Sequence, residues 1–410
     1  MAMTHVLKRR RNFLRINVQF YINIARNINF WIISLSHLFT HVFDLVNLAL
    51  IPIFIEEFSI DLLQAGLLVT LPLLAGMVSS FLSGIIMSKI GHKPLMILSL
   101  LMMGVSALLV SVTPNFLTLM LYLSLLTFAS RLYCPPALSI ISESCEDCEL
   151  DRGKTVGFHV SVVMLGIASG PIFLGFIILH FAWRLLYLIF AIPLFLSTVP
   201  VTRMNVDLLN EEKDKGGEGE AIKIASVMKT SFILLLISLG FRSMGIQGVS
   251  TFMTTYFVSE KGLSKSISSI LYGVGGAFGI IGVLAGGAIS DKMGEKRWIT
   301  ITWTASLLSL LVFSLAPSMS ILLLFFVLYR VFNSGSIAPV MSLVARFTSK
   351  SRRGLGYMLY FFSSSLMSAF SPIVTARIIE LFGIWYIFPF ALIILGFAIL
   401  MVQLVMPENN

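Results

Sequence analysis

Residues 83–94 read SGIIMSKIGHKP, and residues 287–298 read GAISDKMGEKRW. In each stretch a glycine is followed four positions later by a polar residue, then directly by a lysine, and two positions on by a second glycine. Such a match between distant segments of one chain indicates an internal structural repeat. The matched positions are Gly84, Ser88, Lys89 and Gly91 in the first copy, and Gly287, Asp291, Lys292 and Gly294 in the second.

Further landmarks recur at nearly the same spacing. They comprise an arginine inside an apolar segment, an arginine-glycine pair that begins another, and a tryptophan near the start of a third. Together with the glycine motif, these make four landmarks in the same order. Such a series is hard to obtain by chance, and it predicts two parallel structural units. The corresponding pairs are Arg131 with Arg330, Arg152 with Arg353, and Trp183 with Trp385.

The composition excludes an ordinary soluble domain. Hydrophobic residues make up 57% of the chain, charged residues make up only 12%, and the mean hydropathy is +0.93. Soluble domains carry about 25% charged residues. One water-surrounded core could not hide so many apolar side chains, so lipid must be the solvent for most of them.

The apolar residues fall into twelve segments of the length that a membrane-crossing helix needs, about 20 residues. Turn signals such as Thr113-Pro114-Asn115 separate neighbouring segments. A β-barrel is excluded because its strands would alternate polar and apolar residues. The predicted spans are 29–55, 62–87, 94–113, 115–141, 155–181, 183–203, 230–258, 266–289, 297–316, 319–345, 354–381 and 384–406.

The basic residues set the predicted topology. If the N-terminus is cytoplasmic, most of the 29 lysines and arginines lie on the cytoplasmic side, as the positive-inside rule requires. This placement accounts for the net charge of +9 without a nucleic-acid partner. The first apolar segment is long and is followed by no cleavage signal, so we interpret it as a retained membrane helix. Both termini are expected in the cytoplasm, and the protein in the inner or plasma membrane.

The longest polar stretch includes the segment NEEKDKGGEGEAIK, which divides the chain almost in half. Its charge and glycine content predict a flexible linker between two six-helix bundles. The sequence therefore predicts an all-α membrane protein of twelve helices with pseudo-twofold symmetry. The predicted parts are a cytoplasmic segment 1–28, an N-terminal bundle 29–203, a linker 204–229, a C-terminal bundle 230–406 and a tail 407–410.

From about Asn29 to Met406 the chain resembles the major facilitator superfamily. That family carries the motif glycine-x-x-x-aspartate-basic-x-glycine-basic-basic after its second helix, and the copy that begins at Gly287 matches it except at Glu295. The first copy departs further, with Ser88 in place of the acid and His92 in place of a basic residue. The resemblance implies that these loops are gates, with Asp291 the better candidate for a latch. The alternative is a charged turn that only fixes topology.

A second resemblance lies in the fifth span, where spaced glycines and a Gly-Pro pair follow the pattern associated with proton antiporters. Small residues allow helices to approach closely, and a proline in a membrane helix permits a kink. The structural alternative is plain helix packing. The positions are Gly157, Gly166, Gly170, Pro171 and Gly175.

Four charged side chains lie near the centres of spans: Asp44, Arg131, Arg242 and Arg330, in the first, fourth, seventh and tenth. A charge at that depth costs about 2.5–3.5 kcal/mol on insertion scales, so it indicates a functional site. The resemblance implies that these same four helices line the central cavity. We interpret the three arginines and Asp44 as candidate substrate ligands, and their net positive charge favours an anionic or neutral solute.

His37, His41 and Asp44 fall on one stripe of the first helix because they are spaced i, i+4 and i+7. Two imidazoles and a carboxylate on one face form a candidate proton relay, with Arg131 as its partner. The alternative is a hydrogen-bonded stripe that only holds the first helix against its neighbours. His159, in the fifth span, is interpreted as structural.

The cysteines supply no metal site by spacing. Cys145 and Cys148 form a CxxC in an acidic stretch, but no second cysteine pair completes a zinc site. We interpret this pair as reduced thiols in an ordinary cytosolic loop, and we expect no metal; the third cysteine is Cys134.

The sequence favours a proton-coupled secondary transporter of a small organic solute, working by alternating access as an antiporter or efflux protein. It contains no G-x-x-x-x-G-K-[ST] motif, so the driving force would be an ion gradient and no cofactor is expected. An importer or symporter of organic anions is the alternative transporter, and a sensor or channel is the alternative of another class. No nucleophile constellation indicates an enzyme. The expected partners are the substrate and the bilayer, and the expected functional unit is a monomer.

Overall fold

The computed structural model describes residues 24–147, 152–204, 230–348 and 353–405. Within them the regular structure is helical, and twelve spans are long and apolar enough to cross a membrane, which confirms the predicted fold class. The first six spans consist of α2 (Ile28–His41), α3 (Phe43–Ala49) and α4 (Ile51–Phe58), then α5 (Leu62–Ile90), α6 (His92–Ser111), α7 (Phe116–Asp147), α8 (Arg152–Ile177) and α9 (Arg184–Arg203). The last six consist of α10 (Thr230–Ser259), α11 (Lys265–Met293), α12 (Glu295–Ser314), α13 (Met319–Ser334) with α14 (Ile337–Arg346), α15 (Arg353–Phe382) and, after the short helix η5 (Ile384–Tyr386), α16 (Ile387–Leu404).

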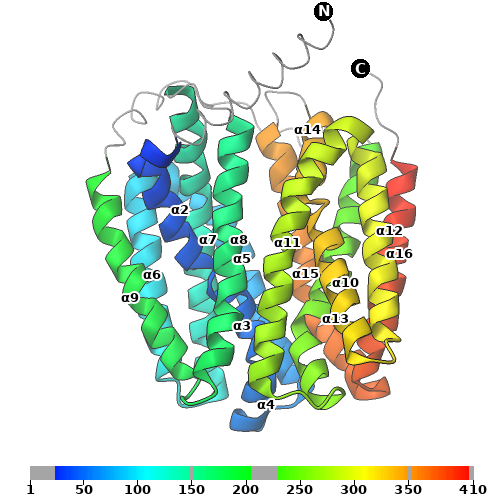
Figure 1. The fold of residues 1–410 in the computed structure, drawn as a ribbon. Helices are drawn as coiled ribbons and strands as arrows, with labels where there is room; N and C mark the ends of the chain where they lie inside the picture. The colour runs from blue at the N-terminus through cyan, green and yellow to red at the C-terminus, as the bar shows by residue number, and fades with distance from the viewer. Residues whose placement is uncertain (1–23, 148–151, 205–229, 349–352, 406–410) are drawn as a thin grey trace, which may run out of the picture.

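The helices form two bundles that stand side by side (Figure 1). Helices α2 to α9 make the first bundle and α10 to α16 the second. The first described helix begins and the last one ends at the same end of the molecule, uppermost in Figure 1. We call this the linker end, because α9 ends there at Arg203 and α10 begins there at Thr230. The opposite end, where α4 meets α5, is called the far end.

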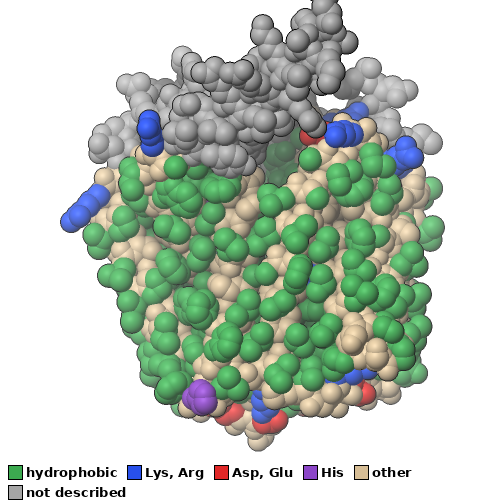
Figure 2. Space-filling model, in the orientation of Figure 1, with side chains coloured by type: hydrophobic (Ala, Val, Ile, Leu, Met, Phe, Trp, Pro, Cys, Tyr) green, Lys and Arg blue, Asp and Glu red, His purple; other side chains and the backbone are tan. Residues whose placement is uncertain are grey.

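The outer surface is suited to lipid. Large hydrophobic side chains are exposed along most of the spans, for example Phe81, Leu196 and Ile393 at 64%, 63% and 71% of their area. In Figure 2 these side chains form a broad belt, with charged side chains confined to the two ends. Without water in the hydrocarbon, the backbone must satisfy its own hydrogen bonds, which a helix does within its own segment.

The internal repeat is visible in the turns that the two motifs form. Gly91 and Gly294 end α5 and α11 with φ of 84° and 86°, a backbone conformation that favours glycine. Each N–H donates to the carbonyl four residues earlier, at 2.8 Å in both cases. Next to these turns, Lys93 donates to the Met204 carbonyl and Lys296 to the Val405 carbonyl. The two turns are therefore built alike in the two halves.

The departure from the family motif at Glu295 has a local explanation. Glu295 accepts hydrogen bonds from Ser342 at 2.9 Å and from Arg346 at 2.7 Å. In the first half, His92 bonds Ser139 at 3.1 Å in the corresponding place. The residue after the turn glycine thus connects α6 to α7 in the first bundle and α12 to α14 in the second.

Two spans that the sequence presents as single helices are divided in the structure. In the first, Pro52 has no N–H to give to the Leu48 carbonyl, and the helix is divided before α4. In the tenth, Pro339 likewise leaves the Gly335 carbonyl free, and the Trp298 indole donates to it at 3.1 Å. The first span also runs to Phe58, beyond the expected end at residue 55.

The two bundles meet mainly through α8 with α11 and α5 with α15. Among the described residues, the hydrogen bonds between the bundles lie toward the far end. Thr254 donates to the Leu48 carbonyl freed by Pro52 at 3.0 Å, and Ser266 donates to the Gly175 carbonyl at 2.7 Å. Lys265 pairs with Glu56 across the same boundary. At the linker end, by contrast, the surface between the bundles is hollowed (Figure 2).

Candidate functional site

A cavity of about 260 Å³ lies between the two bundles. Its wall includes apolar side chains such as Leu68, Met103 and Ile167, but its polar lining comes from both halves of the chain. A concave, mostly apolar site with a few convergent polar groups is typical of small-molecule binding. The polar lining residues are Thr40, Asp44, Asn47, Thr127, Ser130, Arg131, Gln247 and Ser250.

Asp44 and Arg131 are brought together on this wall. The Arg131 Nη2 atom lies 3.5 Å from Asp44 Oδ2, and the same carboxylate oxygen lies 2.7 Å from His41 Nδ1. Gly76 of α5 makes room for the arginine, because a Cβ there would come 3.0 Å from Arg131 Cγ. The carboxylate thus has two cationic or hydrogen-bonding partners and one face toward the cavity.

The imidazoles behind Asp44 continue as a hydrogen-bonded chain. His41 Nε2 lies 3.2 Å from His37 Nε2, and His37 Nδ1 lies 2.8 Å from His159 Nε2. His159 Nδ1 in turn lies 2.8 Å from Ser34 Oγ. His37, His41 and His159 are buried. The predicted stripe of the first helix therefore exists, and its members do contact one another.

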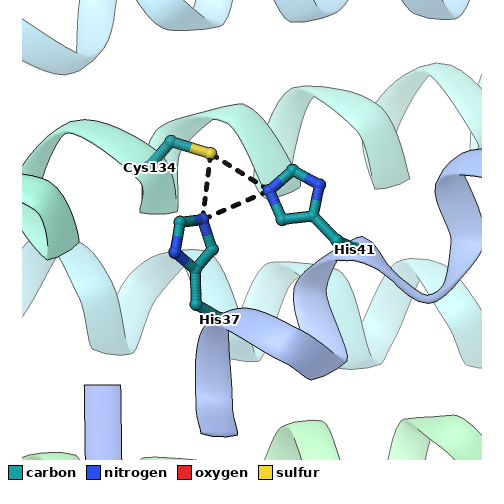
Figure 3. Close-up of side chains that lie close together, drawn as sticks. All are labelled: His37, His41 and Cys134. Carbon is teal, nitrogen blue, oxygen red and sulfur yellow. Dashed lines mark hydrogen bonds between the residues drawn. The ribbon is translucent and has the colours of Figure 1, made fainter. Parts of the chain in front are cut away.

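His159 and Cys134 join this cluster although the sequence analysis did not select them. The Cys134 Sγ atom lies 3.3 Å from His37 Nε2 and 3.4 Å from His41 Nε2 (Figure 3). The available signal was His159 itself, since an ionisable side chain inside a membrane span indicates a functional site; Cys134 carried no such signal, because a free cysteine commonly behaves as a small hydrophobic residue. Among the cysteines, only the spacing of Cys145 and Cys148 suggested a metal site. Cys148 lies outside the described residues, and nothing is described of the Cys145 side chain.

Helix α7 is fixed against α2 around the cluster. Ser130 donates to the Thr40 carbonyl at 3.1 Å, and Tyr133 shares a hydrogen bond with Ser36. Tyr133 is fully buried. These contacts hold Arg131 and Cys134 at the level of the first-helix histidines.

Arg242 forms its hydrogen bonds within the second bundle. Its Nη2 atom donates to the carbonyl and side-chain oxygens of Asn333 at 2.7 and 2.8 Å, and to Ser336 Oγ at 2.9 Å. The guanidinium also lies 5.0 Å from the Trp303 ring centroid, a distance suited to a cation–π interaction. The arginine therefore holds the junction between α13 and α14, and it is not among the residues that line the cavity.

Arg330 is placed differently. Its guanidinium lies 5.7 Å from the centroid of the Tyr272 ring. Its Nε atom is buried and has no hydrogen-bond partner among the described residues. A Cβ at Gly276 would come 3.5 Å from one of its nitrogens and 3.4 Å from Leu45 of the first bundle. Arg330 thus lies close to the boundary between the bundles with hydrogen-bonding capacity to spare.

The glycines of the fifth span serve close packing at several levels. A Cβ at Gly166 or Gly170 would overlap the backbone of α2 at Leu38 or Val42, and one at Gly175 would meet Ile270 and Ser266 of α11. A Cβ at Gly157 would meet nothing within 4 Å. Pro171 lies inside α8 beside Gly170. The motif therefore joins α8 both to the site-bearing first helix and to the other bundle.

The residues that the resemblance assigns to gates lie around the two turns at the linker end. Gly84 and Gly287 each lie near the end of a helix, and Ser88, Lys89, Asp291 and Lys292 are exposed. Arg377 and Glu380, three residues apart in α15, form an ion pair at a distance of 3.0 Å.

Two bundles of six membrane-spanning helices around a mostly apolar cavity with a few polar groups form the architecture of a membrane transporter rather than an enzyme. The chain matches the model of the Major Facilitator Superfamily over residues 33–327 and again over residues 286–410, and it belongs to that family. A bacterial homologue of the human lysosomal transporter Spinster, solved in an inward-facing and unoccupied conformation, superposes with a TM-score of 0.76 at 15% identity. That likeness covers 93% of this chain and 96% of the other.

Relatives of known name are distant. The multi-drug resistance efflux pump PmrA of Streptococcus pneumoniae is 24% identical over 324 residues, 73% of this chain and 76% of the pump. The cis,cis-muconate transport protein of Acinetobacter baylyi is 23% identical over 297 residues, 67% of this chain and 70% of that protein. An MFS-type efflux pump of Mycolicibacterium smegmatis is 25% identical over 158 residues, and the chain spans only 37% of its length.

Proposed function

We propose that the protein is a secondary active transporter that exports a small organic solute in exchange for protons. The observation that carries this proposal is Asp44, whose carboxylate lines the cavity while it contacts both Arg131 and His41. A proton on Asp44 would weaken its attraction to Arg131, and a solute entering the cavity would compete for the same groups. Similarity to efflux pumps supports the direction of transport.

In this proposal the linker end faces the cytoplasm, with both termini on that side and the protein in the inner or plasma membrane. The closed far end is then the outer gate, and the two bundles rock about the cavity between them. The motif loops around Ser88 and Asp291 would close the cytoplasmic side in the opposite state. The transporter works as a monomer without a cofactor, and the proton gradient supplies the energy.

His41 and His37 would relay the proton between Asp44 and the interior of the first bundle. Their support is the unbroken series of hydrogen-bonding distances from the carboxylate to His37. Arg131 would act in both coupling and substrate binding because it reaches the carboxylate and the cavity at once. Arg330 would contribute to binding through its unpartnered Nε, whereas Arg242 would support the site through the second bundle.

A second candidate substrate class is organic anions, carried inward or by symport. It is favoured by the basic lining of the cavity at Arg131 and by similarity to the muconate transport protein. A dicarboxylate would suit an arginine-lined site because guanidinium groups bind carboxylates in a bidentate manner.

The test is substrate-linked proton movement in proteoliposomes that enclose a pH-sensitive dye. The probes are ethidium, a lipophilic cation, and cis,cis-muconate, a dianion. We expect one of them to elicit proton flux that Asp44→Asn abolishes and that Glu380→Gln, a carboxylate change outside the cavity, leaves intact. Solute flux without proton movement, unchanged in Asp44→Asn, would contradict proton coupling. The probe that responds distinguishes the two substrate classes.

A further inference from the structure

Two imidazoles and one thiol point at one small space. His37 Nε2, His41 Nε2 and Cys134 Sγ form a triangle with edges of 3.2, 3.3 and 3.4 Å (Figure 3). A tetrahedral ion bound by nitrogen and sulfur at about 2.0–2.3 Å holds such ligands about 3.3–3.6 Å apart. The three ligand atoms therefore already stand within a few tenths of an ångström of a metal-binding arrangement.

The other nitrogen of each imidazole is held from behind. His41 Nδ1 faces the Asp44 carboxylate at 2.7 Å, and His37 Nδ1 faces His159 at 2.8 Å. Metal-bound histidines almost always donate their second N–H to a carboxylate, a carbonyl or water, as His41 can to Asp44, and this fixes the ring and leaves the first nitrogen free to bind. The His159 nitrogen can accept from His37 in the same way. The supporting groups of a metal site are thus present as well as the ligands.

When both Nδ1 atoms carry their protons, the three atoms of the triangle have too few hydrogens to make all three contacts hydrogen bonds. The two Nε2 atoms then face each other as acceptors, and the Cys134 thiol can donate to only one of them at a time. A bound cation would satisfy both lone pairs and the thiolate together. Binding releases the thiol proton, so one proton leaves for each ion that enters.

We propose that His37, His41 and Cys134 bind a thiophilic metal ion, Zn²⁺ or Cu⁺, within the first bundle. Imidazole and thiolate ligands suit these ions, whereas Mg²⁺ and Ca²⁺ require oxygen ligands. Three protein ligands leave a fourth position open. The triangle lies one residue behind the cavity wall, because Asp44 lines the cavity and directly contacts His41.

The metal site is additional to the proposed transport cycle. A bound ion would block the proton relay that the cycle uses. A proton relay needs the Nε2 lone pairs of His41 and His37, and a bound ion occupies both. Metal binding and proton transfer are therefore alternative states of one cluster, and the ion acts as an inhibitor of coupling. Binding itself can be measured without any transport substrate, so the two proposals fail independently.

The experiment titrates the purified full-length protein in detergent with Zn²⁺ by calorimetry, and with Cu⁺ against a competing chelator. Cys145 and Cys148 are first replaced by serine, so that the CxxC pair cannot bind the ion. Co²⁺ then serves as a spectroscopic probe, since a thiolate ligand gives a charge-transfer band in the near ultraviolet. We expect one ion per chain, a sulfur-to-cobalt band, and loss of both in Cys134→Ser.

Two further variants make the result specific. Asp44→Asn should lower the affinity about 10–100-fold without changing the stoichiometry, as loss of a supporting group does. His41→Asn should abolish binding. Where a variant does not fold, Zn²⁺ should still protect Cys134 from alkylation in the protein that lacks only the CxxC thiols. No binding at micromolar ion, or unchanged binding and cobalt spectrum in Cys134→Ser, would overturn the proposal.

Discussion

Gly170 of α8 lies directly against the backbone carbonyl of Val42, the residue at which the first transmembrane helix passes from α2 to α3. An added Cβ would overlap that carbonyl oxygen and come 2.7 Å from Val46 Cγ2. Val42 separates His41 from the residues that lead to Asp44. The distance between the two helices at this level is therefore set by the absence of a side chain at position 170.

Replacing Gly170 by alanine should destabilise the first bundle and impair transport. The added methyl group must displace backbone rather than a flexible side chain, and overpacking of this kind costs about 1–3 kcal/mol. The shift would also move the Asp44 carboxylate relative to Arg131. Thermal unfolding in detergent and proton flux in proteoliposomes measure the two effects.

Gly157→Ala is the matched control in the same motif. Its added Cβ meets nothing within 4 Å, and alanine is favoured over glycine within a helix by about 1 kcal/mol. We expect unchanged or raised thermal stability. Equal behaviour of the two alanine variants would show that the close approach at Gly170 does not limit the structure.

Substitutions of Arg242 and Arg131 should have different effects, the first mainly on stability and the second mainly on transport. Arg242→Met removes the charged donor from the oxygens of Asn333 and Ser336, and a hydrogen bond to a charged group contributes about 1.5–3 kcal/mol. We expect a lower unfolding temperature, with the KM for the responding probe unchanged in the protein that folds. Arg131→Met should instead lose proton-coupled flux at nearly normal stability. A large KM change in Arg242→Met would assign that arginine to the substrate.

Much of this architecture could be predicted from the sequence, because lipid imposes length and composition on each span separately. The twelve spans and the paired turns at Gly91 and Gly294 follow from local rules. The sequence did not predict that His92 and Glu295 play the same part in the two bundles, each joining its helix to another. That role depends on which residues of the other helix they contact.

The site was predicted only where its residues share one helix. The spacing of His37, His41 and Asp44 placed them on one face, and the structure agrees. The contributions of Cys134 and His159 depend on how α7 and α8 pack against α2, which no local pattern specifies. The breaks at Pro52 and Pro339 were not predicted. A proline withholds an N–H from the carbonyl four residues earlier, but Pro72, Pro171 and Pro372 do so inside helices that are not divided.

Glu295→Lys should destabilise the second bundle although it restores the basic residue of the family motif. The lysine would face Arg346 where the carboxylate now accepts hydrogen bonds from Arg346 and Ser342. Arg346 is more than half exposed, so we expect a loss of about 1 kcal/mol that salt diminishes. Thermal unfolding at low and high ionic strength measures it. Glu295→Gln, which keeps an acceptor for Ser342, should lose less; a lysine variant as stable as wild type would contradict the assignment.

The contacts that close the far end differ in strength. The Lys265–Glu56 pair is partly exposed, with side-chain exposures of 31% and 65%, so it contributes about 0–1 kcal/mol to the closed state. Thr254 donates to the Leu48 carbonyl from a fully buried position, and losing that bond costs about 1–3 kcal/mol. Thr254→Val should therefore open the far end more than Lys265→Ala does.

Spin labels placed on the two bundles at the far end would report the open fraction as a distance distribution. We expect 1 M salt to shift the wild type toward the Lys265→Ala distribution, because salt screens exposed charges. Salt should leave the additional effect of Thr254→Val in place. Arg377→Ala is the control, since it removes an ion pair within one helix at the same end. If it opens the far end as much as Lys265→Ala does, the change reflects surface charge in general, and Lys265 has no special part in joining the bundles.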